Sequence, residues 1–185
     1  MDLRKHLLEG SVIPAQPLAL DEHRKLSEKH QRAITRYYVD SGVGGLAVGV
    51  HSTQFEIREP QHGLFKPVLE LASQTIDESL AKAPRPFIKI TGLCGRTEQA
   101  IPEAELANSF GYQAGLLSLG AYKDDTEEEM LAHCARVAEV VPVIGFYLQP
   151  SVGGRLLDYS FWRKFAEIPN VIAIKMAPFN RYQTI

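Results

Sequence analysis

The sequence predicts an α/β fold of parallel strands, because short apolar runs alternate along the chain with longer segments of helical period. Three of the apolar runs begin at Gly115, Val143 and Val171, at a constant spacing of 28 residues. A constant spacing indicates a repeated βα unit. The glycine-rich phosphate loop that follows the first strand of an open, doubly wound sheet is absent. These observations favour a (β/α)₈ TIM barrel.

The predicted strands are the runs at 11–20, 44–50, 86–91, 115–121, 141–147 and 171–175. The predicted helices cover 22–39, 62–80, 101–111, 125–140 and 158–168, and Pro67 is expected to kink or divide the second of them. Six βα units are too few for a complete barrel, which has eight strands and about 250 residues. We therefore expect residues 1–185 to form a single barrel domain, truncated after about six units, whose C-terminal part is missing from this chain.

Composition narrows the class of protein. The chain has 185 residues, of which 45% are hydrophobic and 23% charged, with a formal net charge of −2 and a pI near 6.3. This balance gives no reason to expect nucleic acid or a membrane as a partner. No apolar stretch approaches the roughly 20 residues that cross a bilayer, and the N-terminal segment lacks the apolar core of a secretion signal, so we expect a cytoplasmic protein. Cys94 and Cys134 have no CxxC partner, which indicates packed, reduced thiols.

Lys175 ends the last apolar run, Val171-Ile172-Ala173-Ile174-Lys175. If the two isoleucines face the helix layer, strict alternation turns Lys175 into the barrel at the carboxyl end of its strand, where barrels build their active sites. A lysine at the end of a strand is more often a solvated rim residue. In a partly dry site, however, its pKa falls, and the neutral amine becomes a nucleophile.

The preceding strand places a phenol near this amine. Alternation within 141–147 puts Val143, Gly145 and Tyr147 on one face, so Tyr147 is expected to point inward at the carboxyl end of the neighbouring strand. Schiff-base formation needs proton transfers to and from a carbinolamine, which a phenol can mediate. Lys89 alternates with isoleucines in the same way, but no tyrosine motif accompanies it, which favours a rim position or a structural ion pair.

These residues also carry a resemblance. Tyr147-Leu148-Gln149-Pro150-Ser151, followed by AEIPNVIAIK ending at Lys175, resembles the dihydrodipicolinate synthase and N-acetylneuraminate lyase family of class I aldolases. Members have a Tyr-Asn-x-Pro type motif and a strand of the type IPNIVGIK that contains the Schiff-base lysine. The resemblance extends over nearly the whole chain. It implies that Lys175 is the nucleophile and that Tyr147 transfers protons.

The resemblance assigns further residues and also shows departures. Tyr122 matches the second residue of a Tyr-Tyr pair that completes a proton relay in the neighbouring subunit, although Ala121 replaces the first. Family members have Gly-Thr-Thr-Gly-Glu where this chain has Val50-His51-Ser52-Thr53-Gln54. The resemblance therefore implies that Ser52 and Thr53 hold the carboxylate of a 2-oxo acid, with His51 beside them. Val152 stands where dihydrodipicolinate synthases have a carboxylate-binding arginine, and Arg155 is not its direct equivalent, so this chain is an atypical member.

The combined prediction is a Schiff-base lyase or aldolase that joins Lys175 to pyruvate or another 2-oxo acid and then makes or breaks an adjacent C–C bond. The six histidines show no HxH or HExxH spacing, so we expect neither a metal nor a separate cofactor. A dehydratase or decarboxylase would use the same residues. Two other classes remain open: a non-catalytic relative that binds a small acid, and a barrel fragment with a structural role. The resemblance implies a homotetramer or homodimer.

Overall fold

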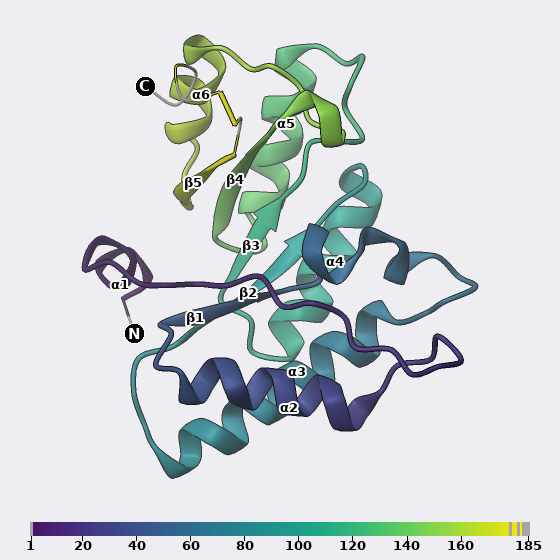
Figure 1. The fold of residues 1–185 in the computed structure, drawn as a ribbon. Coiled ribbons are helices and arrows are strands. Elements are labelled where there is room, and N and C mark those ends of the chain that lie inside the picture. The colour runs from purple at the N-terminus through teal and green to yellow at the C-terminus, as the bar shows by residue number, and fades with distance from the viewer. Residues whose placement is uncertain (1, 178, 181, 183–185) are drawn as a thin grey trace. The chain divides into compact units, whose positions relative to one another are not determined.

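The computed structural model describes residues 2–177, 179–180 and 182 (Figure 1). The chain divides into two compact units. The first comprises the residues up to Gly92 together with Leu106–Gln113, and the second comprises Leu93–Glu105 and the chain from Ala114 onward. That residues 1–185 form one barrel domain stays a prediction, and each unit is described by itself.

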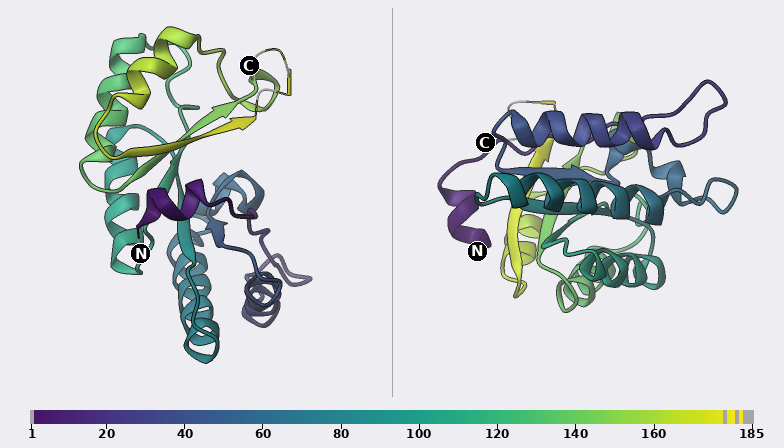
Figure 2. Two further views of the ribbon diagram at one scale, coloured as in Figure 1. Left: turned by 90° about the vertical axis from the view of Figure 1, so that its left-hand side faces the viewer. Right: turned by 90° about the horizontal axis from the view of Figure 1, so that it is seen from below.

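The first unit contains two parallel strands and two long helices. Its elements are α1 (Leu3–Leu8), α2 (Glu28–Asp40), β1 (Gly45–Val48), the short 3₁₀ helices η1 (His51–Thr53) and η2 (Phe55–Arg58), α3 (Phe65–Lys82) and β2 (Ile88–Leu93). β1 pairs in parallel with β2, from Gly45 opposite Ile88 to Val48 opposite Thr91. The helices α2 and α3 lie side by side (Figures 1 and 2). Every residue of β1 is buried, as expected for a parallel strand covered on both faces.

Two predicted elements of this unit differ from the structure. The segment 11–20 forms no strand and makes two isolated bridges, a parallel one from Ala15 to Ala47 and an antiparallel one from Leu20 to Leu26. Pro14 and Pro17 explain the difference, because neither has an N–H group to donate to a neighbouring strand. Helix α2 begins six residues later than predicted, at Glu28, because the chain first forms a tight turn in which Leu20 bridges Leu26.

The expected kink at Pro67 is also absent. α3 is continuous from Phe65 to Lys82, and Pro67 is its third residue. The first four N–H groups of a helix have no carbonyl partner within it, so a proline in the first turn removes no hydrogen bond.

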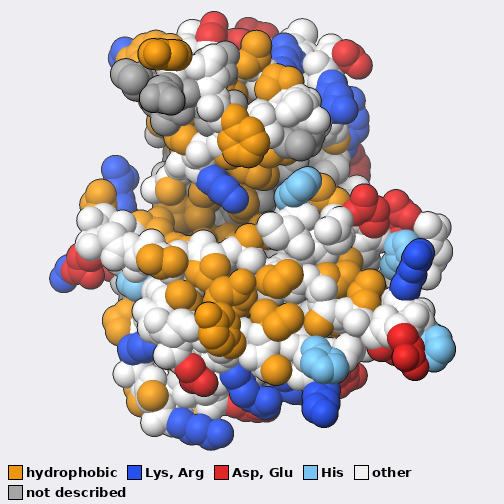
Figure 3. All heavy atoms as spheres, viewed as in Figure 1, with side chains coloured by type: hydrophobic (Ala, Val, Ile, Leu, Met, Phe, Trp, Pro, Cys, Tyr) orange, Lys and Arg blue, Asp and Glu red, His pale blue; other side chains and the backbone are white. Residues whose placement is uncertain are grey.

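Apolar side chains gather at the surface of the first unit on the face that Figure 3 shows. The exposed apolar residues of this unit include Val12 and Leu20.

The second unit contains the repeated βα pattern. Its elements are α4 (Thr97–Ser109) as far as Glu105, β3 (Ala114–Leu117), α5 (Glu127–Ala138), β4 (Val143–Leu148), the 3₁₀ helix η3 (Pro150–Val152), α6 (Tyr159–Ala166) and β5 (Val171–Ala177). β3, β4 and β5 are parallel neighbours. Gly115 pairs with Val143 and Val143 with Val171, so the 28-residue spacing read from the sequence is the pairing register itself.

Helix starts in the second unit follow local sequence signals. Thr126 and Glu129 form a reciprocal capping box at the start of α5, as the acidic segment there predicted. Asp158 caps α6 by accepting a hydrogen bond from the N–H of Phe161. Both helices cover one face of β3–β5 (Figure 2, left), where Phe161 and Phe165 of α6 are fully or almost fully buried.

Among the residues that the structure describes, no helix is long and apolar enough to cross a membrane.

Candidate functional site

Lys175 lies near the carboxyl end of β5, opposite Phe146 of β4. Its Nζ atom is 4.8 Å from the centre of the Phe146 ring. Ile174, the preceding residue, packs instead against the apolar cluster that contains α6, so Lys175 points away from the helix layer as predicted. The residue remains exposed, but partial burial of the side chain lowers the pKa of its amine. A lowered pKa makes the neutral, nucleophilic amine more abundant.

Tyr147 does not share this face. Its ring centre is 5.3 Å from that of Trp162 in α6, and the side chain is buried in the cluster beneath the helices. A Cβ atom on the preceding alternate residue, Gly145, would lie 2.6 Å from Phe165 and 2.9 Å from Trp162, so Gly145 also faces α6. The prediction that Tyr147 points inward beside Lys175 is therefore wrong, and Phe146 occupies that place.

A β-bulge explains the error. The spacing of 28 residues pairs Val143 with Val171 and, if continued, would pair Tyr147 with Lys175. The register shifts between Val143 and Ile144, and from Ile144 onward each residue of β4 pairs one position later on β5. Because side chains alternate between the faces of a strand, a shift of one residue exchanges the faces. The same bulge separates Val171 from the face that Ala173 and Lys175 share.

The loop predicted to bind a carboxylate lies in the first unit, after β1. His51 and Ser52 are exposed, and the ring of His51 contacts Phe55 edge to face at 5.7 Å. Thr53 is fully buried. Its hydroxyl donates to the Gln16 carbonyl at 2.6 Å and accepts from the Gly49 N–H at 3.1 Å. Thr53 therefore holds the loop in place, and Ser52 and His51 are the side chains that it presents.

Gln16 is a structural residue that the sequence reading missed. It is fully buried, its Nε2 donates to Thr35 Oγ1 at 2.5 Å, and its carbonyl accepts from Thr53. A glutamine between two prolines in an otherwise apolar segment was the available signal, because a buried amide needs hydrogen-bond partners.

Tyr122 is held inside the second unit by a cluster of polar and aromatic groups. Only 5% of the residue is exposed. Its hydroxyl is 3.3 Å from Thr97 Oγ1, and its ring stacks on His133 with a centre-to-centre distance of 4.6 Å. Arg96 lies over the ring at 4.7 Å and makes two hydrogen bonds of 2.9 and 3.0 Å to Asp125. A relay role for Tyr122 in a neighbouring subunit stays a prediction.

Three residues of this cluster were not assigned a role from the sequence. Arg96 is half-exposed and is paired with Asp125. His133 is buried, donates to or accepts from Thr97 Oγ1 at 2.9 Å, and has its pKa lowered to about 4, mainly by burial. It is therefore neutral near pH 7. Thr97 joins the hydroxyl of Tyr122 to this neutral imidazole.

Arg155 binds backbone rather than presenting a free guanidinium. Its Nη1 atom donates to the Asp125 carbonyl at 2.6 Å and to the Tyr122 carbonyl at 3.3 Å. The residue thus holds the segment before α5, in agreement with the view that it does not replace a carboxylate-binding arginine.

Lys89 forms a structural ion pair, as the sequence favoured. Its Nζ atom is 2.9 Å from Asp77 Oδ1 and 3.0 Å from Ser73 Oγ, both on α3. Cys134 is fully buried, and burial raises the pKa of its thiol to about 12, so it is an unreactive packing residue. Within residues 2–177, 179–180 and 182, no three His, Cys, Asp or Glu side chains gather closely enough to hold a metal ion.

Comparison with known proteins identifies the family of this chain. The profile of the Dihydrodipicolinate synthetase family matches residues 9–185. The chain belongs to this family. It is 26% identical over 182 residues to the 4-hydroxy-tetrahydrodipicolinate synthase of Persephonella marina, covering 94% of this chain and 57% of the relative. The corresponding enzyme of Desulforudis audaxviator is 28% identical over 177 residues, with the same coverage.

Solved structures show the same fold. The Clostridium difficile protein CdNal, determined in complex with mannosamine, matches with a TM-score of 0.80 and 19% identity, covering 94% of this chain and 58% of that one. Dihydrodipicolinate synthase from Agrobacterium tumefaciens matches with a TM-score of 0.75 and 22% identity, covering 95% and 56%. The predicted α/β barrel class is confirmed, and the chain spans a little over half the length of these dihydrodipicolinate synthetase relatives.

Proposed function

We propose that the protein is a metal-independent Schiff-base lyase or aldolase in which Lys175 is the nucleophile. The observation that carries this proposal is the position of Lys175. It lies near the carboxyl end of a parallel strand, points away from the helices, and has an amine whose pKa is lowered by burial. Membership of the dihydrodipicolinate synthetase family supports the proposal.

The proposed substrate is pyruvate or another small 2-oxo acid. The neutral Lys175 amine adds to the ketone carbon to give a carbinolamine, and uptake of one proton from solvent with loss of one water gives a protonated imine. The imine withdraws electrons from the adjacent carbon, so that a C–C bond there can form or break. Hydrolysis of the imine releases the product and restores the lysine, and no separate cofactor takes part.

The loop after β1 is proposed to bind the carboxylate of this substrate. Ser52 offers an exposed hydroxyl donor, and His51 lies next to it. Thr53 acts by fixing the loop through its hydrogen bonds to Gln16 and Gly49. The original assignment of Thr53 as a direct ligand would require its hydroxyl to leave these two partners.

Borohydride trapping with a panel of 2-oxo acids tests the proposal on the full-length protein. We expect pyruvate or a related 2-oxo acid to give a stable reduced adduct on the peptide that contains Lys175, and Lys175→Ala to give none. Lys89→Met is the matched control, because it removes the other strand lysine considered as a nucleophile and should leave trapping at Lys175 intact. An adduct on another lysine, or no adduct with any 2-oxo acid in a folded protein, would contradict the assignment.

A second candidate, a non-catalytic relative that binds a small acid, is favoured by one observation. Phe146, which cannot transfer a proton, stands beside Lys175 where a phenol was expected. This candidate predicts saturable binding of a 2-oxo acid without a trapped adduct and without release of an aldehyde.

A further inference from the structure

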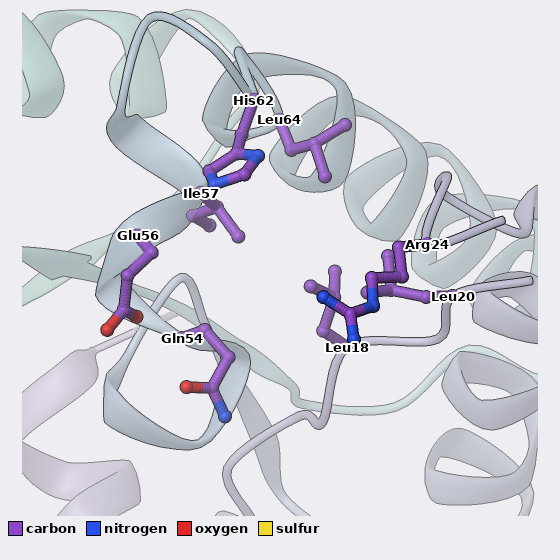
Figure 4. A pocket seen from close by; sticks show the side chains of 8 residues that line it. All are labelled: Leu18, Leu20, Arg24, Gln54, Glu56, Ile57, His62 and Leu64. Atoms are coloured by element: carbon purple, nitrogen blue, oxygen red, sulfur yellow. The ribbon is translucent and has the colours of Figure 1, made fainter.

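A cavity of about 220 Å³ opens between two surface loops of the first unit (Figure 4). One loop lies before α2, and the other joins η1 to α3. The residues that line the cavity are Leu18, Leu20, Arg24, Gln54, Glu56, Ile57, His62 and Leu64. Its wall is mainly aliphatic, and its volume is below the roughly 300–1,000 Å³ of pockets for drug-sized ligands. A ligand that fits must be small and partly apolar.

Two of the lining residues have an unusual backbone conformation. Arg24 has φ +59° and Gln54 has φ +78°, and only four non-glycine residues in the described part of the chain have positive φ values. L-residues with a Cβ adopt this region at a free-energy cost, and such residues gather at ligand sites more often than elsewhere. Two of these four residues with positive φ, Arg24 and Gln54, therefore line the same small cavity.

The turn that contains Arg24 is fixed by its own hydrogen bonds. The Asp21 carboxylate accepts from the N–H groups of His23 at 2.9 Å and Lys25 at 2.8 Å, and the Asp21 carbonyl accepts from the Arg24 N–H at 3.0 Å. The turn thereby holds the Arg24 backbone in its left-handed conformation, a position at which glycine is the usual residue. The side chain that replaces glycine here is directed toward the cavity (Figure 4).

The Arg24 guanidinium is available to a ligand. Arg24 is exposed, and within the part of the chain that the structure describes no side chain forms an ion pair or hydrogen bond with its guanidinium. Glu56 contributes the one carboxylate of the wall, and Figure 4 shows that carboxylate directed away from Arg24. His62 lies across the cavity, with its Nε2 3.9 Å from Glu59. The cavity thus combines an aliphatic wall with one unpaired, permanently charged donor group.

We propose that this cavity binds a small aliphatic monocarboxylate, whose carboxylate pairs with Arg24 and whose hydrocarbon part lies against the aliphatic wall. A guanidinium matches a carboxylate in geometry and charge, and the apolar area gives affinity to the hydrocarbon chain. Gln54 directly follows η1, so an occupied cavity would also restrict the loop that presents His51 and Ser52. The proposed ligand needs no ketone and forms no imine, so this site stands or fails independently of the proposed lyase activity.

Titration calorimetry with 4-methylpentanoate tests the proposal, with 4-methylpentanamide and acetate as comparison ligands. We expect 4-methylpentanoate to bind saturably and the other two to bind at least about tenfold more weakly, because the amide lacks the charge and acetate lacks the hydrocarbon chain. Equal binding of the acid and the amide, or no binding of the acid at millimolar concentration, would overturn the proposal.

Arg24→Gly separates binding from folding. We expect this variant to lose at least about tenfold in affinity for 4-methylpentanoate, while its stability to urea is equal to or higher than that of the original protein, because glycine adopts positive φ without strain. Lys25→Ala, which removes a neighbouring charge of the same turn that does not line the cavity, should bind as the original does. Unchanged binding by Arg24→Gly, or an equal loss in Lys25→Ala, would refute the site.

Discussion

At the residue scale, the amine of Lys175 lies next to an apolar side chain, the ring of Phe146. The amine is partly covered, beside the ring of Phe146, and burial lowers its pKa below the ordinary value of about 10.4. Near neutral pH a protonated lysine is therefore less favourable in the folded protein than in the unfolded chain. This unfavourable contribution is complete well below the folded pKa, and it disappears above the ordinary pKa, where the amine is neutral in both states.

The first prediction concerns stability. Lys175→Met replaces the amine by an uncharged side chain of similar length, so we expect the variant to unfold in urea at an equal or higher midpoint near neutral pH. The difference should shrink as the pH approaches about 10. A clear loss of stability at neutral pH would show that the charged amine is well solvated or paired in the folded protein.

The second prediction concerns Tyr147, whose ring packs against Trp162. Since its side chain faces α6, we expect Tyr147→Phe to change the rate of borohydride-trapped imine formation by no more than about twofold, whereas removal of a direct proton-transfer group usually lowers a rate by 10²–10⁴. Single-turnover trapping measures this rate. A fall of a hundredfold with unchanged stability would restore Tyr147 as the proton-transfer residue.

At the element scale, one polar connection joins β2 to α3. Lys89 is 7% exposed and donates to Ser73 and Asp77 of α3 and, at 3.4 Å, to the carbonyl of Phe110. The Asp77 side chain is 61% exposed, so water can solvate its carboxylate if the ammonium of Lys89 is removed. The side chain of Lys89 is only 9% exposed, so water cannot replace Asp77 as a partner of its ammonium. The two halves of this ion pair therefore contribute unequally to stability.

The third prediction follows from this difference. Lys89→Ala should lower the free energy of unfolding by about 2–4 kcal/mol, because it removes buried methylene groups and the buried ammonium that donates to the Ser73 hydroxyl oxygen and to Asp77. Asp77→Asn should lower it by about 1 kcal/mol or less. Urea unfolding of both variants gives the comparison, and equal losses would contradict the assigned asymmetry.

The bulge between β4 and β5 is the other decisive feature at this scale. It shifts the pairing by one residue, so that Phe146 instead of Tyr147 lies opposite Lys175. Nothing in the local sequence marks it, because VPVIGFY and VIAIK both read as regular apolar strands. A bulge is set by how two strands and the helices over them pack together, and a sequence pattern of period two carries no information about it.

At the scale of the whole molecule, two compact units carry different parts of the predicted site. Lys175, Tyr147 and Tyr122 belong to the second unit, and the loop 51–53 belongs to the first. The chain belongs to the dihydrodipicolinate synthetase family but spans a little over half the length of its curated relatives, with identities of 26–28% to two of them. Membership of the family and departure from its motifs are thus both properties of this chain.

The sequence by itself determined the fold class and the repeated βα unit, because these depend on periodicity and on helix-capping residues such as Thr126 and Asp158. Only the tertiary structure decided that Phe146 lies beside Lys175. It also decided that the Thr53 hydroxyl is hydrogen-bonded to the backbone of Gln16 and Gly49, and that the Tyr122 ring is packed between Arg96 and His133. These outcomes depend on contacts between residues far apart in the chain, where a shift of one position or one hydrogen bond changes the face or the partner of a side chain.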